Sequence, residues 1–270
     1  MPGTAPLDVL SQDGDWRVLA LLIAAAFAAG WIDAVVGGGG LLQLPALLLV
    51  PGMTPIQALA TNKLASLFGT ATSSVAYYRR VRPDLRTTLP MACVALFGSF
   101  GGASVASFLP AAVFKPIIVA ALLGVAIITL ARPSLGAATS LKHEGRRHLL
   151  VAGATGAAIG FYDGILGPGT GTFLVISLVG VLGYDFLMAS AKAKIVNFAT
   201  NLGALLFFIP LGAVLWPLGL AMGAANVLGS LLGARMAIAR GARFVRILFL
   251  VVVGVLIVKL ILDIWRDAAG

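Results

Sequence analysis

Hydrophobic residues run along this chain in long stretches that are separated by short connections richer in polar residues. The long apolar stretches cover residues 18–36, 89–109, 113–131, 149–166, 186–209, 217–232 and 244–264. Because a bilayer core of about 30 Å needs roughly 20 residues of helix, most of these stretches are long enough, or nearly long enough, to cross it. The pattern predicts an all-α fold, a polytopic transmembrane helical bundle embedded in the lipid bilayer.

Composition excludes the alternative of a soluble helical protein. Of the 270 residues, 60% are hydrophobic and 11% are charged, whereas soluble domains carry about 25% charged residues. Too little polar sequence is left to cover a surface that faces water. The 33 glycines agree with this conclusion, because small residues allow helices to pack closely in lipid.

The net charge of +9 indicates topology rather than a nucleic-acid partner. The basic residues gather in three connections between apolar stretches, a pattern typical of cytoplasmic loops. The clusters are Arg79, Arg80, Arg82 and Arg86; Arg132, Lys142, Arg146 and Arg147; and Arg235, Arg240, Arg243 and Arg246. We therefore expect no nucleic-acid partner and place these clusters on the cytoplasmic side.

An intramembrane enzyme is the main alternative from another functional class, and the sequence argues against it. Such enzymes need metal ligands or a nucleophile with its base. The two histidines, His143 and His148, lie in or beside a basic connection, and no HExxH or GxSxG motif is present. The single cysteine, Cys93, excludes an internal disulfide and a cysteine-based metal site. We expect no catalytic residues, no metal and no cofactor.

The chain contains an internal repeat. Shifted by 130 positions, GWIDAVVGGGG at 30–40 falls on GFYDGILGPGT at 160–170. A shift of 129 brings ATNK at 60–63 onto ASAK at 189–192, and a shift of 131 brings GSFGGA at 98–103 onto GSLLGA at 229–234. Matching Asp and Lys positions in the same order are hard to obtain by chance, so we interpret this as a duplication. The shift of 130 also pairs Phe114, Gly124 and Val125 with Phe244, Gly254 and Val255.

The basic clusters indicate that the second half is inverted relative to the first. If they are cytoplasmic, the helix at 55–78 ends inside, whereas its counterpart at 186–209 ends in the uncharged IPLGAVLWP and so outside. Opposite directions require an odd number of crossings per half. Each half has four long helices, so the fifth segment must be the short stretch at 41–50 or 172–182, which either spans the bilayer or is re-entrant. We predict two inverted repeats of about five helical segments each, four long helices plus one short or re-entrant segment.

This arrangement divides the chain into five parts. They are an N-terminal tail at 1–16, a first transmembrane repeat at 17–131, a basic cytoplasmic linker at 132–147, a second transmembrane repeat at 148–264 and a C-terminal tail at 265–270. Inverted repeats with short, glycine-interrupted helices recur in secondary transporters, which bind substrate near the midplane where the repeats meet. We therefore expect alternating access around a central site.

The paired motifs resemble those of a known transporter family. AAGWIDAVVGGGG with ATNK, and GFYDGILGPGTG with ASAK, closely resemble the sulfite exporter TauE/SafE family over about residues 17–264. Pro168 departs from the glycine pattern, since Gly38 stands there in the first half. The resemblance implies a multi-pass protein of the bacterial inner membrane that transports small sulfur-containing anions such as sulfite, sulfoacetate, thiosulfate or similar sulfonates. An anion channel and a non-catalytic membrane assembly factor are the alternatives, and coupling to a proton or ion and a homodimer are left open.

Two lysines are the first candidates for binding an anion. Thr54 followed by a proline predicts a helix start, and Asp185 can cap the equivalent helix in the second half. Lys63 and Lys192 then lie about 12 Å and about 10 Å along their helices, close to the midplane. A charge at that depth costs several kcal/mol and normally marks a substrate pathway, although long side chains can also extend to the interface. For Lys194, which has no counterpart in this alignment, we expect the latter.

Small polar residues and helix breaks near the lysines complete the predicted site. Amide donors suit an oxyanion that has lost its water, and packing between helices is the alternative. The glycine segments 37–40 and 167–171 break a helix and begin a short one, which exposes backbone N–H groups and the positive end of a helix dipole. The predicted substrate-binding residues are Lys63, Lys192, Asn62, Asn197, Asn201, Gly38, Gly39, Gly40, Gly169 and Thr170.

Asp33 and Asp163 each precede a glycine break by four residues. A carboxylate in the last turn of a helix opposes the helix dipole, so it needs another stabilising partner. We expect these residues to cap a neighbouring short helix, to pair with a lysine, or to take up a co-transported proton.

The predicted topology places both chain ends on the outer side of the membrane, which is the periplasm in a bacterium. In a Cys93→Ser background, Ser11→Cys and Ala268→Cys should react with a membrane-impermeant thiol reagent in intact cells. Protection of both positions would contradict the odd number of crossings per half, and with it the inverted repeat.

Overall fold

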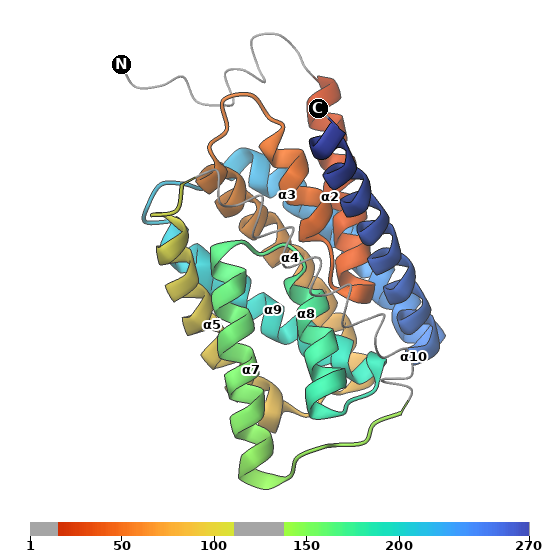
Figure 1. Cartoon of the computed structure of the whole chain (residues 1–270). Helices are drawn as coiled ribbons and strands as arrows, with labels where there is room; N and C mark the ends of the chain where they lie inside the picture. Colours follow the sequence, from red (N-terminus) through yellow and green to blue (C-terminus); the bar gives the residue numbers. More distant parts are fainter. Residues whose placement is uncertain (1–15, 111–137, 270) are drawn as a thin grey trace.

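The computed structural model describes residues 16–110 and 138–269, and in these parts of the chain the regular structure is helical, as predicted (Figure 1). The helices of the first half are α2 (Trp16–Val36), α3 (Gly40–Leu48), α4 (Pro55–Val81) and α5 (Leu85–Ala106). Those of the second half are α7 (Gly145–Ile165), α8 (Thr170–Ser177), the π-helical turn η1 (Leu178–Leu182), α9 (Phe186–Phe208) and α10 (Trp216–Ala269). The helix expected at 113–131, with its repeat matches, and part of the basic linker lie outside the described residues.

Several of these helices are suited to a membrane. Within the described residues, α2, α5 and the segment Trp216–Val245 of α10 are long and apolar enough to cross a bilayer. Long apolar side chains such as Phe97 and Leu150 are exposed on the outside of the bundle, where lipid can cover them. Helix α10 bends at Gly241, whose backbone leaves the helical region, so it is built from two successive helices.

The two predicted helix starts are confirmed. Thr54 forms a capping box at the start of α4, in which its hydroxyl accepts from the Gln57 N–H and its own N–H donates to the Gln57 side chain. Asp185 accepts hydrogen bonds from the N–H groups of Leu187 and Met188 at the start of α9. These caps fix the register of the two helices that carry the candidate lysines.

The short apolar segments form short helices, as expected. Helix α3 has nine residues, and α8 continues through η1 to Leu182. Both follow a glycine break, at Gly37 (φ 89°) and at Gly167 and Gly169 (φ 84° and 82°), a backbone conformation that glycine adopts without strain. The two breaks touch, because the N–H of Thr172 donates to the carbonyl of Gly37 at 2.9 Å.

The described residues of the three basic clusters belong to segments at one end of the bundle. In Figure 1 the connection between α4 and α5, the start of α7 and the bend in α10 all lie in the lower part of the molecule. The connections from α3 to α4 and from α9 to α10, which carry no charged residue, lie at the opposite end. This separation agrees with the interpretation that the basic end faces the cytoplasm.

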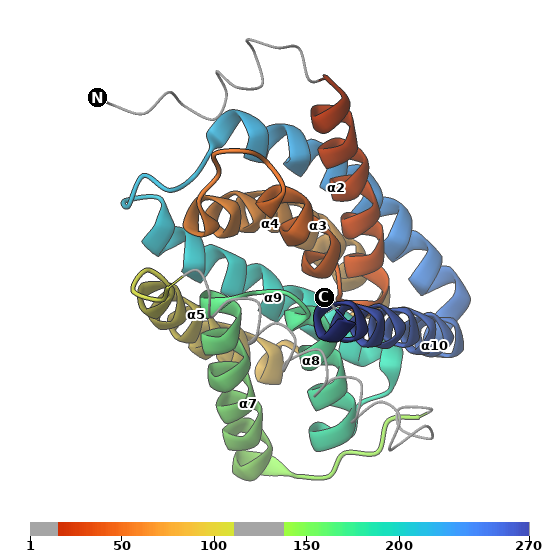
Figure 2. The same ribbon diagram turned by 45° about the horizontal axis from the view of Figure 1, so that its top comes forward.

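One type of helix crossing occurs twice, each time between a helix of the first half and a helix of the second half. Gly98 and Gly102 of α5 pack against the backbone of α7 around Phe161, and Gly229 and Gly233 of α10 pack against the backbone of α2 around Trp31. Figure 2, which views the bundle from another side, shows these neighbouring pairs at its two flanks. Glycine allows this close approach because it has no Cβ atom.

This crossing predicts opposite effects for two adjacent glycines. A Cβ atom added at Gly102 would lie 2.0 Å from the Phe161 carbonyl oxygen, whereas at Gly101 the nearest atom is 4.0 Å away. Gly102→Ala should therefore cost roughly 1–3 kcal/mol of stability through overpacking. Gly101→Ala should be neutral or stabilising, since alanine favours helix by about 1 kcal/mol. Thermal unfolding in detergent measures both, and equal midpoints would contradict the crossing.

Candidate functional site

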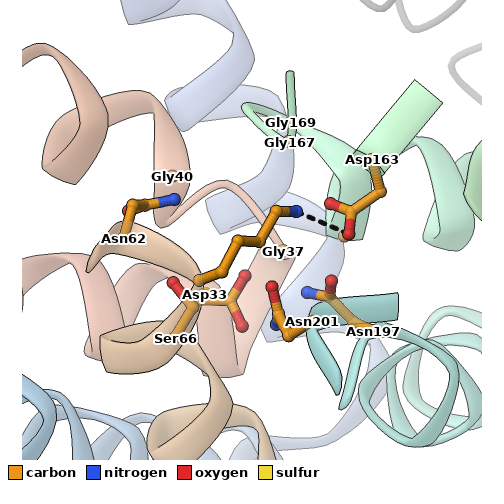
Figure 3. A pocket seen from close by; sticks show the side chains of 12 residues that line it. Asp33, Gly37, Gly40, Asn62, Ser66, Asp163, Gly167, Gly169, Asn197 and Asn201 are labelled. Atoms are coloured by element: carbon orange, nitrogen blue, oxygen red, sulfur yellow. Dashed lines mark ion pairs between the residues drawn. The ribbon is translucent and has the colours of Figure 1, made fainter. Parts of the chain in front are cut away.

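The two halves enclose a polar cavity in the middle of the bundle (Figure 3). The space between protein atoms at this site, open solvent included, is about 280 Å³. Its walls come from α2, α4, α7 and α9 and from both glycine breaks, so each half contributes. The lining residues are Asp33, Gly37, Gly40, Asn62, Lys63, Ser66, Asp163, Gly167, Gly169, Gly171, Asn197 and Asn201.

A buried ion pair crosses this cavity. Lys63 Nζ of α4 lies 2.6 Å from Asp163 Oδ2 of α7, and the two side chains are 1% and 2% exposed. In Figure 3 a dashed line that ends at Asp163 marks this ion pair, and the side chains of Asn197 and Asn201 lie below it. Gly167 makes room for the lysine, because a Cβ atom there would lie 2.8 Å from Nζ. The pair joins the first half to the second.

A second ion pair mirrors the first. Lys194 Nζ of α9 lies 3.2 Å from Asp33 Oδ2 of α2 and also donates to the backbone carbonyl of Asp33. The Lys194 side chain is fully buried, so the prediction that it extends to the interface is wrong. Lys63 and Lys194 each lie nine residues after the capping residue of their helix. Counting from the caps, a signal present in the sequence, would have identified Lys194.

Lys192 lies elsewhere. Its Nζ donates to the backbone carbonyl of Asp84 at 3.0 Å and to the Thr88 hydroxyl at 3.1 Å. The ammonium also lies 4.6 Å from the centre of the Tyr184 ring and 3.6 Å from the Asp84 carboxylate. These contacts are at the basic end of the bundle, and Lys192 is not among the residues that line the cavity. The expectation that Lys192 shares the central cavity with Lys63 is therefore wrong, because the register of α9 turns it away.

The carboxylate beside Lys192 is stabilised in its ionised form. Partial burial acts to raise the pKa of Asp84, but hydrogen bonds from the Thr87 side chain and from backbone N–H groups, together with the Lys192 charge, lower that pKa below its ordinary value. Asp84 is also the cap of α5. Its negative charge therefore stabilises the start of α5 and also pairs with Lys192 at the basic end of the bundle.

The three predicted asparagines line the cavity together with a serine that our selection omitted. Asn62 has a buried amide oxygen without a hydrogen-bond partner, so it retains bonding capacity toward the cavity. The Asn201 amide donates weakly to the Thr70 hydroxyl at 3.5 Å. Ser66 and Asn197 lie three residues after Lys63 and Lys194 respectively, and this spacing places each pair on one helix face.

Of the predicted backbone positions, Gly40 and Gly169 line the cavity and the others do not. Gly39 packs against α2, where a Cβ atom would lie 2.5 Å from the Ala29 carbonyl oxygen. The Thr170 hydroxyl donates to the Gly167 carbonyl at 2.8 Å, and Gly38 packs beside Thr172. The glycines that take their place are Gly37, Gly167 and Gly171.

The charged side chains in and beside the cavity are paired. They form two ion pairs, Lys63 with Asp163 and Lys194 with Asp33, and of these four residues Lys194 is not among those that line the cavity. Gly40 begins α3 and Gly169 caps α8, so the positive ends of two helix dipoles face the cavity. Among the described residues, no group of three or more His, Cys, Asp or Glu side chains is arranged to hold a metal ion.

Comparison with known proteins identifies a family. The sequence profile of the family described as sulfite exporter TauE/SafE matches residues 22–260. The chain is similar to the probable membrane transporter protein ORF9 of a Sinorhizobium species, with 38% identity over 93% of this chain and 95% of that protein. It is also similar to the probable membrane transporter protein of Haemophilus influenzae (33% identity, 91% and 95% covered) and to the probable membrane transporter protein YfcA of Escherichia coli (34% identity, 91% and 90% covered). No solved structure matches the chain.

The two lysines of α9 should differ sharply in their contribution to stability. Lys194→Met leaves the largely buried Asp33 carboxylate without its partner, which should cost about 3–5 kcal/mol. Lys192→Met, the same substitution two residues away, removes hydrogen bonds to the Asp84 carbonyl and the Thr88 hydroxyl but leaves the Asp84 carboxylate 48% exposed to water, and should cost less, about 1–2 kcal/mol. Unfolding in detergent micelles would measure both, and the double variant Lys194→Met/Asp33→Asn should recover part of the loss. Equal losses for the two single variants would contradict the arrangement.

Proposed function

Because this chain belongs to the sulfite exporter TauE/SafE family and is a multi-pass membrane transporter protein, we propose that it carries small sulfur-containing anions through the central cavity. The substrates are sulfite, thiosulfate, sulfoacetate or similar sulfonates. The protein acts as a secondary transporter in the bacterial inner membrane, by alternating access to a single site between its two halves. It has no catalytic role in this proposal.

The observation that carries this proposal is the composition of the cavity. One ammonium group, that of Lys63, lies there with the starts of the two short helices and the amides of Asn62, Asn197 and Asn201. Each of these groups can donate hydrogen bonds to an oxyanion, and hydrogen bonds from charged donors to anionic acceptors are the stronger kind. Sulfite and sulfonates present several oxygens around one sulfur, so they can accept from several directions at once.

Duplicated contacts support the inverted repeat on which alternating access depends. Lys63 of the first half pairs with Asp163 of the second, and Lys194 of the second pairs with Asp33 of the first. A second set of corresponding contacts lies outside the cavity. In it Lys192 donates to the Asp84 carbonyl, and the Leu215 N–H donates to the Thr61 hydroxyl. Positions 84 and 215, like 61 and 192, are 131 apart. Contacts that repeat with the halves exchanged are expected from a two-fold relation between them.

These contacts outside the cavity suggest where the two access routes close. In our proposal the contact of Lys192 with Asp84 closes the basic, cytoplasmic end, and the contact of Leu215 with Thr61 closes the other end. The halves rock against each other around the crossing of the glycine segments, as in other transporters built from inverted repeats. The substrate site then lies between the two closures and opens to one side at a time.

Anion binding should depend on the central lysine and not on Lys192, which lies outside the cavity. Lys63→Met combined with Asp163→Asn removes both charges of the pair, so no buried charge is left unpartnered. This variant should bind thiosulfate about 10- to 100-fold more weakly, because a hydrogen bond to a charged group contributes about 1.5–3 kcal/mol. Lys192→Met is the matched control and should keep the wild-type affinity. Calorimetry on purified protein and uptake of labelled thiosulfate into liposomes are the measurements.

Counterflow separates a transporter from a channel. Liposomes loaded with unlabelled thiosulfate should accumulate labelled thiosulfate transiently if one site alternates between the two sides. A wild-type protein that conducts thiosulfate without counterflow would be a channel. A protein that neither binds nor moves any anion of the panel of sulfite, thiosulfate, sulfoacetate and taurine would refute the proposed substrate class.

A further inference from the structure

The central lysine already has a partner within the protein. The Asp163 carboxylate lies 2.6 Å from Lys63 Nζ in a buried ion pair. A substrate anion that uses the Lys63 charge must therefore displace or share with this carboxylate. Asp163 thus acts as an internal counter-ion that competes with the substrate.

Displacement by an anion alone is unfavourable. Removing one partner from a buried ion pair is strongly unfavourable, because the other charge is left without compensation. The hydrogen bond gained between Lys63 and the anion offsets only part of this cost. The Asp163 side chain is only 2% exposed, so water offers little compensation. The balance requires a second event that neutralises Asp163.

We propose that Asp163 takes up one proton when the anion binds, so that the anion and the proton are loaded together. The Lys63 ammonium moves from Asp163 Oδ2 to an oxygen of the anion, and a proton from the aqueous side bonds to the carboxylate. A carboxyl group in a water-poor site without a cationic partner favours its neutral form, and its new O–H can donate a hydrogen bond to the anion. This inference rests on the proposed function and adds the coupling ion and the residue that carries it.

The surroundings of Asp163 leave Lys63 as its one charged partner among the described residues. Helix α5, which packs along α7, carries one charged residue, Arg86, near its own start, and α8 and η1 carry none. On α9, Lys194 is engaged with Asp33. The neighbouring Tyr162 donates its hydroxyl to the Pro168 carbonyl at 2.6 Å. Protonation of Asp163 therefore acts directly on Lys63.

Asp33 is less suited to the same role. Lys194 is held by the Asp33 carboxylate and also by the Asp33 backbone carbonyl, so its position depends less on the carboxylate charge. Lys194 is also not among the residues that line the cavity, whereas Lys63 is. An anion in the cavity reaches Lys63 and competes with Asp163, while the pair of Lys194 and Asp33 stays closed.

The test measures thiosulfate binding and proton uptake together. Thiosulfate keeps its charge between about pH 5.5 and about pH 8, so any pH dependence in that range comes from the protein. Wild-type protein should bind thiosulfate more tightly at the lower pH, by up to about tenfold per pH unit. It should also take up close to one proton per bound thiosulfate, which a pH-sensitive dye detects in weakly buffered solution.

Two Asp→Asn variants provide the comparison. Asp163→Asn mimics the protonated carboxyl, so its thiosulfate affinity should be independent of pH and its binding should take up no proton. Asp84→Asn removes a carboxylate that contacts the other lysine, Lys192, outside the cavity. It retains a residue that can cap α5 and should keep the wild-type pH dependence.

The outcomes separate this inference from the proposed function. Tight thiosulfate binding that is independent of pH and takes up no proton in the wild-type protein would overturn the coupling and leave anion transport standing. No thiosulfate binding at either pH would overturn both. Because proton uptake is measured on the wild-type protein, the test holds even if Asp163→Asn fails to fold.

Discussion

The requirement that every charge inside a membrane bundle be paired controls the centre of this protein. A lone ammonium or carboxylate in a water-poor interior is costly, and pairing offsets that cost only when the two groups come into close contact. Lys63 and Asp163 achieve this at 2.6 Å, although one lies on α4 of the first half and the other on α7 of the second. The pair of Lys194 and Asp33 repeats the arrangement with the halves exchanged. Each half is thereby completed by a charge from the other.

The glycines provide the space that these contacts need. Gly167 leaves the space through which the Lys63 side chain reaches Asp163, and the backbones at Gly37 and Gly171 touch where the two breaks cross. The same breaks end α2 and α7 and start α3 and α8, so the short helices begin at the cavity. Close packing and exposure of helix starts, which the sequence presents as alternative explanations for glycine, are here two consequences of one crossing.

The two ends of the cavity differ although their contacts correspond. At the basic end a lysine and a carboxylate meet, Lys192 with Asp84, and at the opposite end an N–H group and a hydroxyl meet, Leu215 with Thr61. A charged contact and a neutral one respond differently to salt and to the membrane potential. Under the proposed alternating access, salt and the membrane potential would therefore act differently on the opening of the two ends.

Hydrophobic length, composition, local capping and the repeated motifs were sufficient to predict from the sequence a helical membrane bundle, the starts of α4 and α9, and the short helices. They also placed Lys63 and the three asparagines near one site. These features depend on residues close together in the chain. The choice between Lys192 and Lys194 depended on tertiary structure. The two lysines differ by two positions, which rotates a side chain by roughly 200° around a helix, and the alignment of ATNK with ASAK cannot resolve such a shift in alanine-rich sequence. Packing of α9 against α2 and α5 decided it, because it brings Lys194 to Asp33 and Lys192 to Asp84. These partners lie more than 100 residues away in the chain, and no local pattern specifies them.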